Sequence, residues 1–76
     1  MATIRVCRWH RDALYARGVL ADSDMAIVRG ATPAMYAMSG ETLSRLVAAT
    51  RELIEAGELS GFRNRDAHRF LIDAGA

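Results

Sequence analysis

Cys7, His10 and Asp12 are the residues of this sequence whose types and spacing come nearest to a catalytic group. A cysteine beside a histidine can form an activated thiolate, provided that a third group orients the histidine and that donors stabilise the oxyanion. The sequence around Cys7 has no glycine-rich turn or motif for those roles. We therefore expect a half-buried thiol and a surface imidazole, and we predict no catalytic residue and no enzymatic activity.

Zinc binding is the second chemistry that these residue types suggest. Cys7, His10 and His68 are potential ligands, but structural zinc sites usually have paired ligands at two places in the chain, and here only the first pair exists. The glutamates of residues 52–58 lack the separate environments that drive two carboxyl pKa values apart, so we interpret them as a solvated acidic face. We predict no metal site and no cofactor.

The charges are distributed unevenly along the chain. All ten basic residues are arginine, and they gather toward the two ends, whereas most of the nine acidic residues lie in the middle. A guanidinium group can hold a carboxylate or a phosphate at two points, and it can also stack on aromatic rings. If the two ends meet in space, they form one positive patch that suits an acidic protein surface or a phosphate backbone.

Aromatic residues accompany the arginines at these ends. Trp, Tyr and Arg are the residue types that contribute most to the binding energy of protein interfaces. A group of methionines between residues 25 and 38 is a second apolar feature, either core or a second interface. We predict that the partner-binding residues are Arg8, Trp9, Arg11, Tyr15, Arg65, His68 and Arg69.

Length and composition limit the architecture. A chain of 76 residues forms one domain at most, and its single cysteine excludes an internal disulfide bond. The apolar runs are too short to cross a membrane, and residues 1–11 lack the apolar core of a signal peptide. We therefore predict a single helical domain over residues 1–76, located in the cytoplasm and without membrane contact.

Helical periodicity accounts for most of the chain. We predict a helix from Trp9 to Arg17 that Gly18 ends, with Val19 folding back onto Leu14. A longer helix is predicted over residues 41–56, capped by Ser39, because apolar residues recur along it at helical spacing.

The remaining helices are shorter. Asp22 or Ser23 is expected to cap a helix through Val28, and Thr32–Pro33 is a typical helix start for a segment ending near Gly40. A last helix is predicted from Asn64 to Gly75. Residues 53–63 and 69–72 are also similar to the end of the recognition helix and the wing in excisionase-type winged-helix domains, which would imply two short strands there; we prefer the helix.

The first residues leave two alternatives open. Residues 3–7 alternate between apolar and polar types, which suggests a short strand, but they can equally be the first turns of a helix running to Arg17. A strand would need a partner strand from the same chain or from a second copy. We predict an all-α fold, a compact bundle of four to five short helices with this strand as an option, and a small α+β fold as the alternative.

We infer the function from two features of the sequence. It has no recognisable catalytic group, and its two ends carry arginine and aromatic residues. We expect a small non-enzymatic protein-binding module, of the regulatory or inhibitory kind that phages and mobile elements encode, which docks on a larger protein or protein complex. The alternative is a nucleic-acid-binding domain that uses the arginine-rich ends. A homodimer subunit is the third alternative.

Overall fold

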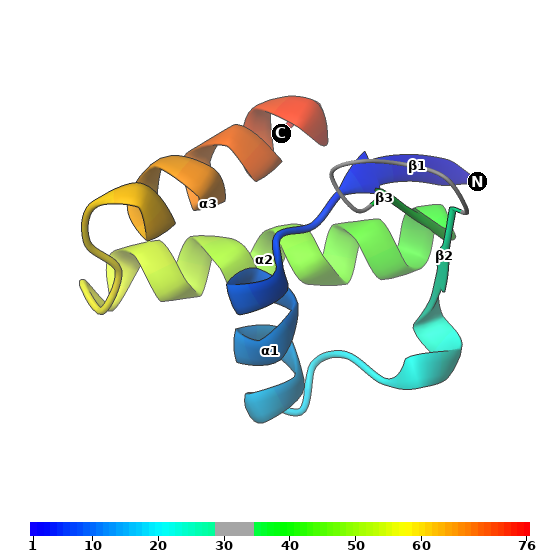
Figure 1. The fold of residues 1–76 in the computed structure, drawn as a ribbon, viewed down its shortest axis with the longest axis horizontal. Helices are drawn as coiled ribbons and strands as arrows, with labels where there is room; N and C mark the ends of the chain where they lie inside the picture. Colours follow the sequence, from blue (N-terminus) through cyan, green and yellow to red (C-terminus); the bar gives the residue numbers. More distant parts are fainter. Residues whose placement is uncertain (29–34) are drawn as a thin grey trace.

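The computed structural model describes residues 1–28 and 35–76 and has an α+β fold (Figure 1). An antiparallel sheet has the strand order β1-β3-β2, so the central strand pairs with both others. Figure 1 shows α2 as the longest element, with β1 and α3 on the same side of it. The elements in chain order are β1 (Ala2–Arg5), α1 (Arg8–Ala16), the 3-10 turn η1 (Asp22–Asp24), β2 (Met25–Ile27), β3 (Met35–Met38), α2 (Gly40–Glu55) and α3 (Phe62–Asp73).

The predicted all-α bundle is wrong, because two of its short helices are strands. Residues 35–38 were expected in a helix, but they form β3, in which Tyr36 and Met38 are buried and alternate with less buried neighbours. Ile4 of β1 lies opposite Tyr36, so both side chains face the core. Cross-strand pairing thus outweighs the weak helical preference of this segment. The open alternative of a short N-terminal strand is the one that the structure has.

The segment after α1 also differs from its prediction. Instead of a helix through Val28, the chain makes the single turn η1 and then enters β2. The Asp24 carboxylate accepts a hydrogen bond from the Ala21 backbone amide at 2.9 Å, which closes the turn. The predicted helix start at Thr32–Pro33 lies outside the described residues.

The other helix predictions are confirmed. Gly18 has a positive φ of 72° after α1, and the Val19 amide donates to the Leu14 carbonyl at 3.1 Å, as in a Schellman motif. Ser39 caps α2 by accepting a hydrogen bond from the Thr42 amide at 3.1 Å. α3 begins earlier than predicted, at Phe62, and this helix takes the place of the strands that a winged-helix wing would need.

The core contains one polar pair among its apolar side chains. His10 of α1 is only 1% exposed, and its Nε2 lies 2.8 Å from the hydroxyl oxygen of Thr50 in α2. The Thr50 hydroxyl donates its own proton to the Leu46 carbonyl at 2.7 Å, so it can only accept from the imidazole. The imidazole Nε2–H is therefore the donor in this contact, and the ring is neutral at pH 7 because burial lowers the pKa of His10 to about 4. The prediction of a surface imidazole is wrong, because His10 lies on the same buried face of α1 as Leu14.

We predict that Thr50→Val lowers the free energy of unfolding by about 1–3 kcal/mol, because the isosteric side chain leaves the His10 Nε2–H buried without an acceptor. Urea denaturation followed by circular dichroism measures the change. Thr3→Val, on an exposed strand position, is the control and should change stability by no more than about 0.5 kcal/mol. Equal stability of Thr50→Val and the native protein would contradict the assigned hydrogen bond.

Candidate partner-binding surface

The residues with catalytic potential lie in environments that do not activate them. Cys7 is half-buried, and burial raises the pKa of its thiol, with the neighbouring Asp66 carboxylate raising it further. A thiol in this state stays protonated at neutral pH and is a poor nucleophile. Within residues 1–28 and 35–76, no three His, Cys, Asp or Glu side chains are placed to hold a metal ion.

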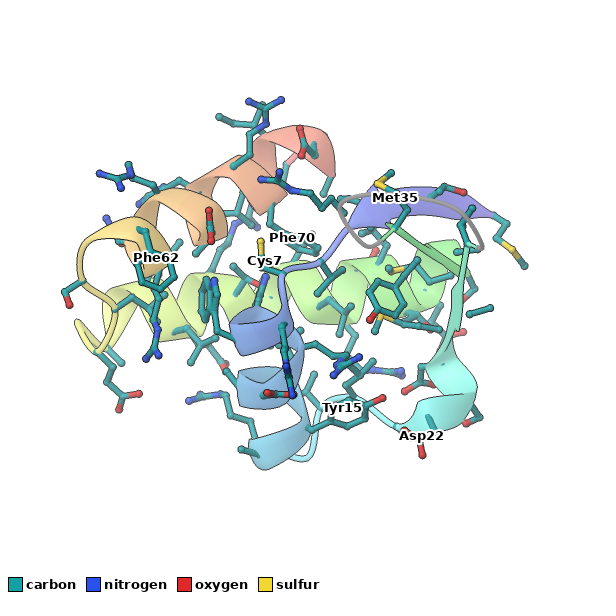
Figure 2. All side chains as sticks on the ribbon, viewed as in Figure 1. Cys7, Tyr15, Asp22, Met35, Phe62 and Phe70 are labelled. Atoms are coloured by element: carbon teal, nitrogen blue, oxygen red, sulfur yellow. The ribbon has the colours of Figure 1, made fainter. Side chains whose placement is uncertain are left out.

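Asp66 joins the N-terminal end of the chain to the C-terminal helix. Its carboxylate accepts a hydrogen bond from the Trp9 indole Nε1–H at 2.9 Å. The indole also stacks on the His10 ring, with 5.1 Å between ring centroids, and the Phe70 and His10 rings form an edge-to-face pair with 4.8 Å between centroids. Figure 2 shows Phe70 on the inner side of α3 and Cys7 at the start of α1. Trp9 was predicted to bind a partner, and the structure gives it an internal contact that holds α1 against α3.

Two other predicted partner-binding residues of α1 also make internal hydrogen bonds. The Arg11 guanidinium donates to the Tyr36 hydroxyl of β3 at 2.9 Å, and the Tyr15 hydroxyl donates to the Asp22 carboxylate at 2.8 Å. Tyr15 remains 36% exposed, so its ring edge is still accessible. Together these contacts fix α1 to the sheet and to the η1 turn. A partner would meet Arg11 and Tyr15 as parts of a rigid surface.

The three predicted residues of α3 share one exposed helix face. Arg65, His68 and Arg69 are all exposed, while Ala67 and Phe70 on the opposite side are buried in the core. Helical spacing places further residues, at positions 62 and 72, on this same side. We call this surface the α3 outer face and define it by Phe62, Arg65, His68, Arg69 and Ile72.

Apolar side chains on the α3 outer face were missed by the sequence analysis. Phe62 is 55% exposed and Ile72 is 70% exposed, at opposite ends of the face. Figure 2 shows Phe62 at the first turn of α3. The guanidinium of Arg63 lies 5.8 Å from the Phe62 ring centroid, within cation–π range. The signal was present in the spacing of residues 62, 65, 69 and 72, but the predicted start at Asn64 excluded Phe62 from the helix.

The charges on this face are mainly positive. Arg69 pairs with Asp73 at 3.0 Å one helical turn later. Arg65 and Arg8 have no ion pair with any residue of the described ranges. Arg8 is exposed at the first residue of α1, the end that the Trp9–Asp66 bond brings to α3. The two basic ends of the chain therefore meet.

Outside this face, two exposed arginines are paired with acidic side chains. Arg17 pairs with Glu52 at 3.3 Å, and Arg45 pairs with Asp24 at 3.0 Å. In the part of the chain that the structure describes, no helix combines the length and the apolar character that crossing a membrane requires.

Comparison with protein-family models, with curated proteins and with solved structures gives no match to this chain. A fold alone does not specify a function. We therefore infer the function from the chemistry and geometry of the α3 outer face.

The buried imidazole predicts an acid-sensitive fold. Burial lowers the pKa of His10 from 6.5 to about 4. As pH falls below 6.5, the unfolded chain takes up this proton while the folded protein does not, so the free energy of unfolding falls until about pH 4. The free energy of unfolding is expected to fall by up to about 3 kcal/mol over this pH range. Urea denaturation at pH 7, 5.5 and 4 measures it.

The matched variants for this prediction are His10→Gln and His68→Gln. His10→Gln keeps an N–H donor for Thr50 without a titrating ring, so its stability should fall less between pH 7 and pH 4. His68→Gln, on the exposed face of α3, should follow the native protein. Parallel losses of stability in all three proteins would show that His10 does not cause the effect.

Proposed function

We propose that this protein is a non-enzymatic binding module whose α3 outer face docks on an acidic, partly apolar surface of a larger protein. The observation that carries the proposal is the exposure of Phe62 and Ile72 at the two ends of a face that also presents Arg65. A partner that covers this face would remove both apolar side chains from water, which favours association. Arginine and aromatic side chains are enriched at such interfaces.

The contacts that hold the inner side of α3 in the core favour a binding role for its outer face. Ala67 and Phe70 hold the inner side of α3 in the core, and Asp66 is held by Trp9. A helix that is already fixed loses little conformational entropy on binding, so more of the contact energy appears as affinity. Apolar contact at both ends of the face favours a protein partner over a phosphate backbone, which is held mainly by charged and polar donors.

A regulatory or inhibitory role fits a module of this kind. A small module that binds a larger protein without catalysing a reaction acts by occupying a surface, and so by blocking or stabilising whatever the larger partner does there. The proposal places it in the cytoplasm, where a single half-buried thiol is stable in reduced form. The proposed role therefore predicts a stoichiometric effect on the partner.

We predict that Arg65→Glu and Ile72→Ser each weaken capture of the partner by about tenfold or more, since loss of a central interface anchor typically costs about 2 kcal/mol or more and tenfold corresponds to about 1.4 kcal/mol. The protein is immobilised through its N-terminus and exposed to a nuclease-treated lysate of the organism that encodes it. Each captured protein is identified, purified and titrated against the variants.

Arg51→Glu is the matched control, because Arg51 is an exposed arginine on α2, outside the α3 outer face. Its affinity for the partner should equal that of the native protein, and circular dichroism should show all variants folded. Capture that is insensitive to both α3 substitutions would refute the proposal. Capture that disappears after nuclease treatment would instead support nucleic-acid binding, which should then weaken steeply with salt.

A further inference from the structure

A surface hollow lies where β1 meets the C-terminal half of α3. Its volume is about 380 Å³, and it is open to solvent rather than enclosed. It begins beside the α3 outer face, since Arg69 belongs to both. We call it the β1–α3 hollow, and its lining residues are Thr3, Ile4, Arg5, Met35, Arg69 and Asp73.

Two guanidinium groups from different elements line this hollow. Arg69 of α3 donates to the Asp73 carboxylate from its Nε at 3.0 Å, which leaves its terminal N–H groups able to donate to another acceptor. Arg5 of β1 is half-buried and has no ion pair with any residue that the structure describes. Asp73 offsets one of the two charges, which leaves the hollow with one uncompensated cation.

The other lining groups select among anions. Thr3 is exposed on β1 and can add a neutral hydrogen-bond donor beside Arg5. Met35 of β3 supplies an apolar wall, and methionine adapts its shape to what it contacts. A hydrated phosphate would leave this wall uncovered. A carboxylate attached to an apolar group would use both the cation and the wall.

We propose that the β1–α3 hollow receives an acidic side chain of the partner together with an adjacent apolar side chain. The carboxylate lies between Arg5 and Arg69, and the apolar side chain covers Met35. This inference rests on the proposed function, because it names what the docking partner inserts next to the α3 outer face. It also makes Arg5 a specificity-determining residue that the sequence analysis did not include.

The test titrates the whole protein, labelled with nitrogen-15, with the probe N-acetyl-leucyl-glutamic acid amide. Binding is measured by NMR from the changes in the chemical shifts of the backbone amides. The amide chemical shifts of the residues that line the hollow should change and then level off as the probe concentration rises. These residues include Thr3, Arg5, Met35, Arg69 and Asp73. The glutamine counterpart of the probe should bind about tenfold more weakly, because it lacks the charge that the arginines hold. Arg5→Gln should weaken binding of the glutamate probe to a similar degree.

Three results would overturn this inference. These are equal binding of the glutamate and glutamine probes, shifts confined to other parts of the molecule, and shifts of the same size with inorganic phosphate. Arg51→Gln is the control variant and should bind the probe as the native protein does. A native protein that fails to bind the glutamate probe, while Arg65→Glu and Ile72→Ser still weaken partner capture, would refute this inference alone. Partner capture that is insensitive to both α3 substitutions would refute the proposed function.

Discussion

A buried imidazole must give its ring proton to an acceptor, and in this fold the acceptor is the Thr50 hydroxyl of α2. The His10 ring is also covered by Trp9 on one side and by Phe70 on another. The imidazole therefore contacts residues from α2 and α3 while it belongs to α1. No other polar side chain among those described links all three helices in this way, and the relative positions of the helices depend on it.

This arrangement also determines where the proposed binding surface lies. Once Trp9 stacks on His10, its indole N–H reaches Asp66, and the inner side of α3 is fixed. The outer side of α3 must then face solvent with whatever residues it carries. The same fixation brings the second half of α3 to β1, so that Arg5 and Arg69 come to line one hollow although they are far apart in the sequence. The proposed surface and the hollow are thus consequences of one packing event.

Parts of this fold could be predicted because local signals agree with tertiary structure. The long helix over residues 40–55 combines an apolar stripe with a Ser39 cap, and Gly18 provides the left-handed residue that ends α1. The strands could not be predicted in the same way. Residues 25–27 and 35–38 are too short for a clear period, and their conformation depends on pairing with each other and with β1.

The candidate surface was predictable in composition but not in detail. Arginines near both ends indicated a joint basic patch, and the structure brings those ends together. However, sequence cannot show which side chains are already engaged by the fold. Trp9, Arg11 and Tyr15 have the residue types of interface anchors, yet each donates a hydrogen bond within the chain.

The small size of the domain explains why some of these residues make internal contacts while others stay exposed. A chain of this length buries a small core, so its stability depends on a few polar contacts between elements as well as on apolar burial. Residues near the centre of the packing, such as Trp9 and Arg11, are needed for those contacts. Only a face whose reverse side is already packed can present arginine, phenylalanine and isoleucine outward without weakening the core. In this protein the face that meets this condition and carries all three residue types is that of α3.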